Sequence, residues 1–176
     1  MSWLFTLLVS AMWLLAGIFS FEYMKHEDNN EGYYRFYMLA LGVLIGLGFA
    51  GNYMTLYMFF EGMTLLTLPM VLHSKTKEAI AAGKKYLFYS MFGATLALVG
   101  FFFINTYGTT IEFPAGGVLS PERVAGKENM ILLVIFLVIV GFGAKAGMFP
   151  LHGWLPTAHP VAPAPASAVL SGVITK

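Results

Sequence analysis

Three charged side chains stand inside long apolar stretches. Glu61 interrupts FFEGMTLLTLP, Lys145 interrupts GFGAKAGMFP, and Lys176 ends the segment SAVLSGVITK. A charge at membrane depth costs several kcal/mol and is kept mainly along ion and proton pathways. The pattern therefore indicates proton transfer between one acid and two bases. Each residue also has a structural interpretation, because Glu61 can stay protonated, Lys145 can extend to the membrane surface and Lys176 can be solvated.

A proline- and histidine-containing break follows Lys145. Pro150 removes a main-chain donor and frees carbonyls one turn back, and Pro156 adds a second interruption. Broken helices at membrane depth are tolerated where they line a cavity. His152 and His159 flank the break, and an imidazole with an unperturbed pKa of about 6.5 suits a proton relay. A hydrogen-bonded interfacial histidine fits the same pattern equally well.

The composition predicts an all-α polytopic membrane protein. Of the 176 residues 58% are hydrophobic and 11% are charged, against about 25% charged in soluble domains. The chain has no cysteine, and its four histidines form no close pair, so neither a metal site nor an iron–sulfur cluster is expected. It has no GxxxxGK[ST] sequence, and no cofactor is expected. A net charge of +1 gives no reason to expect nucleic acid as a partner.

Residues 1–176 are predicted to form one transmembrane domain of about five helices and the start of a sixth, with a broken helix at Lys145–Pro150. The run 36–74 has Glu61 as its only charge. As one helix it would be about 58 Å long, roughly twice the membrane core, so it must fold back at Gly51-Asn52. The first apolar run lacks a basic n-region and is expected to be a retained span. The expected helices are 3–23, 34–50, 53–73, 86–105, 129–149 and 165 onward.

The basic residues predict the orientation. Six lie in the first and third connections and two in the long fourth one, whereas the second connection has none. Because cytoplasmic loops are enriched in lysine and arginine, the N-terminus is predicted to lie outside a cell membrane that the chain crosses several times. The eight residues are Lys25, Arg35, Lys75, Lys77, Lys84 and Lys85 against Arg123 and Lys127.

Glu61 and Lys145 suggest a mechanism. A pair at about 4 Å and an effective dielectric near 20 would be worth roughly 4 kcal/mol. Tyr57 and Thr64, one turn on either side of Glu61, would offer it hydroxyl hydrogen bonds. Moving the glutamate away would release the lysine's proton through water to Lys176.

Two glycine pairs have GxxxG spacing, which permits close approach of a neighbouring helix. Gly42 and Gly46 form the first pair, and Gly143 and Gly147 enclose Lys145. Packing is the simplest expectation for the first pair, whereas the second would let a partner helix or water reach the lysine.

The run AKAGMFPLHGWLPTAHPVAPAPASAVLSGVITK resembles the signature of the antiporter-like, proton-translocating subunits of respiratory complex I (NADH–quinone oxidoreductase), Mrp-type sodium/proton antiporters and membrane-bound hydrogenases. The resemblance covers about residues 21–176. It implies that Glu61 lies on the family's fifth helix, Lys145 on the broken seventh and Lys176 on the eighth, so that the chain corresponds to helices three to eight. Thr157 stands where the family usually has aspartate.

The resemblance implies a proton-translocating membrane subunit of a respiratory or hydrogenase-type redox complex, an ion-pumping subunit without redox chemistry or cofactors of its own. Its partners would be other membrane subunits and the lipid bilayer. The alternatives are an Mrp-type sodium/proton antiporter subunit and a truncated, inactive remnant, because family members are longer than this chain. Sodium needs oxygen ligands, and Glu61 is the one intramembrane carboxylate, so protons are favoured.

Overall fold

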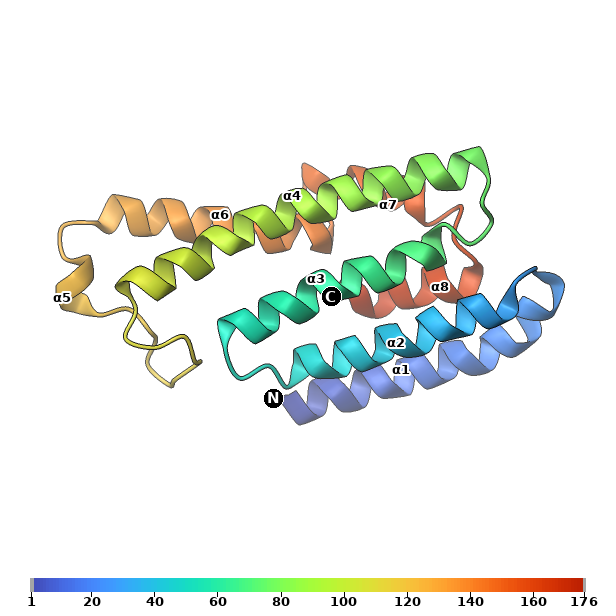
Figure 1. Ribbon diagram of the computed structural model, residues 1–176, viewed down its shortest axis with the longest axis horizontal. Helices are drawn as coiled ribbons and strands as arrows, with labels where there is room; N and C mark the ends of the chain where they lie inside the picture. The colour runs from blue at the N-terminus through green and yellow to red at the C-terminus, as the bar shows by residue number, and fades with distance from the viewer. Residues whose placement is uncertain (1, 176) are drawn as a thin grey trace.

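A computed structural model describes residues 2–175, and these residues form helices and connecting loops without a β-strand. The long helices run alternately in opposite directions, so that α1, α3 and α6 point one way and α2 and α4 the other (Figure 1). The helices are α1 (Ser2–Tyr23), α2 (Asn30–Gly48), α3 (Tyr53–Val71), α4 (Lys77–Tyr107), α5 (Pro121–Val124), α6 (Glu128–Ala146), α7 (Leu155–Ala158) and α8 (Ala164–Val169). Shorter turns are the 3₁₀ helices Met24–His26 and Leu151–Trp154 (η2) and the π-helical turn Leu170–Ile174 (η3).

Four helical segments of the described chain are long and apolar enough to cross a membrane, namely Ser2–His26, Tyr53–Val71, Lys77–Tyr107 and Glu128–Ala158. The prediction of an all-helical protein is confirmed. Of the five full spans expected, the one at 34–50 is not among these four. Helix α2 has 19 residues, but it begins with the polar sequence NEGYYR. Helix α8 and η3 together form a shorter apolar helix, Ala164–Ile174.

The outer face of the bundle is apolar. Leu7 is 68% exposed on α1, Phe88 is 69% exposed on α4, and Phe136 is 62% exposed on α6. Large contiguous apolar surfaces are rare on soluble monomers and mark membrane or protein contact. This surface therefore fits the hydrocarbon that the span lengths predict.

Side-chain caps set where two helices begin. Asn52 accepts the Thr55 amide at 2.8 Å and starts α3 at the expected Tyr53. Thr76 accepts the Ala79 amide at 3.1 Å and starts α4 at Lys77. The prediction that this helix begins near Tyr86 is therefore wrong. Lysine is a good helix former, so the basic segment continues the helix beyond its apolar part.

Helices α4 and α6 cross where two glycines face each other. A Cβ atom on Gly93 would lie 2.5 Å from the Gly141 carbonyl oxygen, and a Cβ on Gly141 would lie 2.6 Å from the Gly93 carbonyl oxygen. Only glycine permits main-chain contact this close. In the first expected pair, Gly46 meets the Phe59 ring on α3, whereas Gly42 has open space beside it. The crossing at Gly141 places the end of α6 against the middle of the bundle.

Candidate functional site

The end of α6 positions Lys145. The helix stops at Ala146 rather than at the expected Phe149, because Gly147 adopts a left-handed conformation with φ 77°. The Gly147 amide donates to the Ala144 carbonyl at 3.3 Å, and the Met148 amide donates to the Gly143 carbonyl at 2.8 Å. These two bonds form a Schellman motif, which satisfies the last carbonyls of a helix. The bonds satisfy the Gly143 and Ala144 carbonyls, whereas the Ala146 carbonyl, four residues before Pro150, is not one of their acceptors.

The segment after the break folds back onto this helix end. Pro150 precedes η2, whereas Pro156 lies in the first turn of α7, a position that suits proline. Trp154 is fully buried, and its Nε1 donates to the Ala144 carbonyl at 2.9 Å. This bond ties the break to the residue next to Lys145. Gly143 and Gly147 face Met148 and Leu155 of the same segment rather than another long helix.

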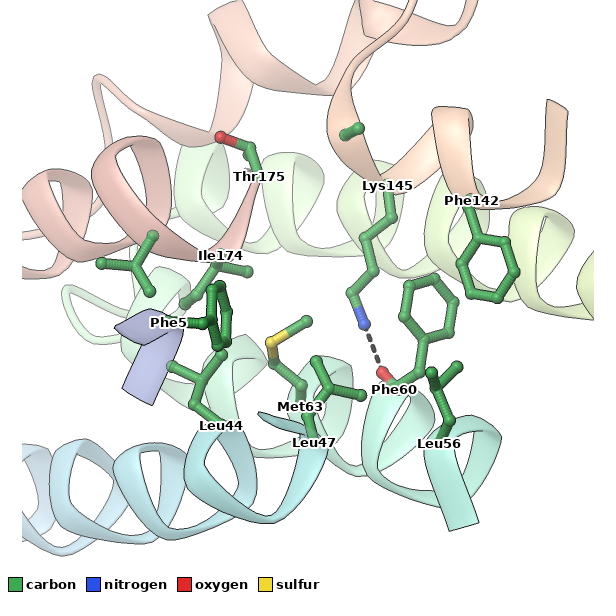
Figure 2. A pocket seen from close by; sticks show the side chains of 12 residues that line it. Phe5, Leu44, Leu47, Leu56, Phe60, Met63, Phe142, Lys145, Ile174 and Thr175 are labelled. Atoms are coloured by element: carbon green, nitrogen blue, oxygen red, sulfur yellow. Dashed lines mark hydrogen bonds between the residues drawn. The ribbon is translucent and has the colours of Figure 1, made fainter. Parts of the chain in front are cut away.

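Lys145 extends from α6 to the middle of α3. Its side chain is 1% exposed, and its Nζ donates to the Phe60 carbonyl oxygen, as Figure 2 shows. The Nζ also donates to Thr64 Oγ1 at 2.6 Å and lies 4.1 Å from the centre of the Phe60 ring. Burying an ammonium group is costly unless it is hydrogen-bonded, and a ring face adds a cation–π attraction. All the contacts that stabilise this ammonium group come from neutral groups on α3.

Glu61 lies beside this contact without joining it. The ion pairs that the structure shows among residues 2–175 are the exposed pairs Lys25–Glu22 and Arg35–Glu31. The predicted 4 Å pair with Lys145 is therefore not formed. One reason is that Phe60 and Thr64, four residues apart, share the face of α3 that Lys145 contacts, whereas Glu61 is turned to the next face.

The carboxylate of Glu61 also lacks the hydroxyl partners expected for it. Its Oε1 is buried with no hydrogen-bond partner within the described chain. The Thr64 hydroxyl, expected to serve the glutamate, accepts from Lys145 instead. Glu61 is thus a half-buried acid with an unsatisfied oxygen, next to a buried base.

A set of hydroxyls that sequence reasoning missed lies one turn farther along α3. Thr67 Oγ1 donates to the Met63 carbonyl at 2.7 Å and lies 2.8 Å from Tyr86 Oη on α4. Thr67 and Tyr86 are both fully buried. A threonine three residues after Thr64 was the available signal, but sequence alone does not show which face of α3 meets α4.

A cavity of about 290 Å³ separates Lys145 from the end of the described chain. Figure 2 shows the lysine on one side of it and Thr175 on the other. Apart from these two residues its walls are apolar, and Lys176, the predicted next carrier, lies outside the described residues. The lining residues are Phe5, Leu44, Leu47, Leu56, Phe60, Met63, Phe142, Lys145, Ala146, Val173, Ile174 and Thr175.

The two histidines of the break differ in their surroundings. His152 is exposed and stacks on Phe149 with ring centres 5.7 Å apart. His159 is half-buried, its Nδ1 lies 2.8 Å from Ser167 Oγ, and its ring stacks on Trp154. Within the described chain neither forms a hydrogen bond with Lys145. Residues 2–175 contain no group of three histidine, aspartate or glutamate side chains that could hold a metal ion.

Known proteins are similar to this chain in sequence and in the arrangement of their helices. The profile of the family described as "NADH:quinone oxidoreductase/Mrp antiporter, TM" matches residues 50–176. Hydrogenase-4 component B of Escherichia coli is 33% identical over 97% of this chain and 25% of its own length. A Na(+)/H(+) antiporter subunit of Bacillus subtilis is 26% identical over 98% of this chain and 35% of its own length.

A solved structure supports the fold. A chain of the archaeal membrane-bound sulfane sulfur reductase, a respiratory membrane complex, superposes with a TM-score of 0.81 at 24% identity. The match covers 99% of this chain and 35% of that chain. Our chain thus spans between a quarter and about a third of the length of these three proteins. The resemblance drawn from the motif is confirmed, and the chain belongs to the NADH:quinone oxidoreductase/Mrp antiporter transmembrane family.

Proposed function

We propose that this chain carries protons in a membrane subunit of a respiratory or hydrogenase-type redox complex, through Glu61, Lys145 and Lys176. The observation that supports this most directly is the burial of Lys145 against acceptors without charge. If a carboxylate accepted from the ammonium, loss of the proton would leave a buried charge without its partner, at a cost of several kcal/mol. A carbonyl and a hydroxyl leave no such charge, so Lys145 can take up and release a proton in place.

In this scheme the negative charge of Glu61 acts on Lys145 electrostatically, without a hydrogen bond between them. An ionised Glu61 favours the ammonium form of Lys145, and protonation or reorientation of the glutamate removes that support. The proton then passes through water to Lys176, the next carrier of the scheme. A volume of about 290 Å³ has room for several water molecules, each of which occupies about 30 Å³ in the liquid.

The histidines would connect this route with the solvent at the surface of the subunit. His152 is exposed and His159 is half-buried in the same break, so the two provide successive proton acceptors at increasing depth. An imidazole can exchange protons in the physiological range. The break is joined to the residue preceding Lys145 through Trp154, so a shift of the histidines would reach the lysine.

The proposed topology puts the basic end of the bundle in the cytoplasm. The α1–α2 and α3–α4 connections lie at one end (Figure 1), and these connections with their adjoining turns hold six lysine and arginine side chains against two at the other end. By the positive-inside rule α2 is then a fifth crossing, and the N-terminus lies outside. The exposed apolar faces would contact lipid and the other membrane subunits of a complex I-like, hydrogenase-like or Mrp-like assembly.

Replacement of Lys145 tests the proposal. The complete assembled protein is placed in liposomes, and proton movement is followed with a pH-sensitive dye. We expect Lys145→Ala to abolish transport, and Lys145→Arg to abolish it too, because arginine keeps the charge but does not release its proton. The control Lys25→Ala removes an exposed lysine from a surface ion pair and should leave the rate unchanged. Transport at the wild-type rate in Lys145→Ala would refute the proposal.

Sodium/proton antiport is the alternative, and one feature favours it. The Phe60 carbonyl, the Thr64 hydroxyl and the Glu61 carboxylate lie within two turns of α3, and oxygen atoms of these kinds are the ligands of hard cations. Lys145 occupies two of them. If proton movement in the same liposomes requires sodium, antiport replaces the redox-coupled function, whereas an unchanged rate in sodium-free buffer excludes it.

A further inference from the structure

A strip of hydroxyls continues from Lys145 along α3 and across to α4. Thr64 accepts from the lysine at 2.6 Å, and Thr67 follows one turn later and lies 2.8 Å from the Tyr86 hydroxyl. The hydroxyls of Thr64 and Ser90 are further polar neighbours of the same phenol. Residues three or four apart share one face of a helix, so Thr64 and Thr67 lie one turn apart on the same face of α3, and the Tyr86 phenol lies beside both.

These hydroxyls are placed where apolar packing would be expected. Thr64, Thr67 and Tyr86 are fully buried, Ser90 is 1% exposed, and the Ser90 hydroxyl has no hydrogen-bond partner within the described chain. Buried hydroxyls are usually satisfied, and an unsatisfied one calls for an explanation such as a bound water. The Thr67 hydroxyl is already satisfied by the Met63 carbonyl of its own helix. Its hydrogen bond to Tyr86, which holds α3 to α4, therefore explains only part of why these hydroxyls are buried together.

The strip has a direction. Helix α3 ends and α4 begins at the end of the bundle that carries Lys75, Lys77, Lys84 and Lys85 (Figure 1). Thr67 is one turn nearer to that end than Thr64. Tyr86 directly follows the lysine pair in α4, and its ring lies against Trp154 of the break, with centres 4.9 Å apart. The hydroxyls thus extend from the buried lysine toward the basic end, and none of them lines the cavity.

We propose that Thr64, Thr67 and Tyr86 form a hydroxyl branch that moves protons between Lys145 and the basic end of the bundle. This inference rests on the proposed proton-carrying function of Lys145. In this scheme Lys145 exchanges protons with Lys176 by one route. It exchanges protons with the basic end of the bundle through the branch. Lys145 is then the point where two separate routes meet.

Proton transfer along the branch leaves it chemically unchanged. A proton arriving at the Thr67 oxygen displaces the Thr67 proton to the Tyr86 oxygen. The phenolic proton then passes to the neighbouring Thr64 oxygen, and the Thr64 proton passes to the unprotonated Lys145 amine. Each oxygen gains one O–H bond as it loses another, and the amine gains one N–H bond. Rotation of the O–H groups then resets the branch, with no oxidant or reductant involved.

The matched pair Tyr86→Phe and Tyr53→Phe tests the branch in the assembled protein in liposomes. Both tyrosines are buried and bridge α3 and α4, since the Tyr53 hydroxyl donates to the Ala97 carbonyl at 2.8 Å. Only Tyr86 belongs to the branch. We expect Tyr86→Phe to slow proton transport about tenfold, which is about 1.4 kcal/mol in the barrier, and Tyr53→Phe to leave the rate close to that of the wild type.

Thr67 gives a second test that does not depend on tyrosine packing. Thr67→Val keeps the shape and removes the hydroxyl, so it should slow transport like Tyr86→Phe, whereas Thr67→Ser restores the hydroxyl and should recover most of the rate. Equal rates for Thr67→Val and Thr67→Ser, or equal losses in both tyrosine variants, would overturn the branch. Loss of transport in Lys145→Ala together with wild-type rates in Tyr86→Phe and Thr67→Val would reject the branch and leave the proposed function standing.

Discussion

Gly141→Ala should separate α6 from α4 and thereby disturb Lys145 four residues later. The added Cβ atom would lie 2.6 Å from the Gly93 carbonyl oxygen and 2.7 Å from the Ala97 amide nitrogen. Both atoms belong to the main chain of α4, so no side-chain rotation relieves the overlap. The helices must move apart, and we expect this shift of α6 to disturb the bond from Lys145 to Thr64 on α3.

The expected magnitude follows from the geometry. Overpacking of a tight contact costs about 1–3 kcal/mol, whereas alanine in an open helix position is favoured over glycine by about 0.5–1 kcal/mol. Gly42→Ala is the matched control, because a Cβ atom there has no neighbour within 4 Å. The two variants should therefore change stability in opposite directions.

Thermal unfolding of the purified protein in detergent, followed by tryptophan fluorescence, measures the difference. Trp154 reports on the site directly, since it bonds to Ala144 beside the lysine. Proton transport in liposomes should fall in Gly141→Ala and not in Gly42→Ala. If Gly141→Ala unfolds at the same temperature as Gly42→Ala and transports normally, the close crossing of α4 and α6 does not position Lys145.

Two further variants test the elements that hold the site. Asn52→Ala removes the cap that accepts the Thr55 amide and should destabilise the protein by about 1 kcal/mol; Asn52→Ser retains a cap, and equal melting temperatures for the two would contradict the assigned role. Trp154→Phe removes the indole donor to the Ala144 carbonyl and should cost about 1 kcal/mol. Its effect should include lower proton transport, because the break loses its tie to α6, and a stability loss with full transport would show that the tie is only structural.

The helices can be anticipated from sequence better than their ends. Long apolar runs and the turn at Gly51-Asn52 locate α3 correctly because Asn52 is a strong cap. The start of α4 is harder to place because Lys77, Lys84 and Lys85 suggest a loop, although lysine supports a helix that continues beyond its apolar part. The end of α6 is misplaced because Gly147, and not Pro150, stops it. Charge and proline are conspicuous in a sequence, but capping decides where a helix ends.

Some residues of the site can be predicted from the sequence, and others cannot. Glu61 and Lys145 stand out because a charge within an apolar run is rare, and the structure brings the two onto adjacent helices. The acceptors of the lysine were not predictable, since one is the Phe60 main-chain carbonyl, a group that every residue has. Thr67 and Tyr86 escape notice because a hydroxyl gains its role from the helix face it occupies. That face depends on how α3, α4 and α6 pack, which a single sequence does not specify.

The choice of a main-chain acceptor has a consequence for how the site is controlled. The Phe60 carbonyl has two lone pairs, so it can accept from Lys145 and also from an amide of its own helix. Its bond to the lysine therefore persists whatever side chain stands at position 60, and it holds the amine on α3 in either protonation state. In the proposed function, control then falls to the two groups that can change, the Thr64 hydroxyl, which can rotate, and the Glu61 carboxylate, which can gain a proton or turn. Because these lie on neighbouring faces of one helix, a small rotation of α3 would alter both at once, and this links the protonation of Lys145 to movement of α3 against α6.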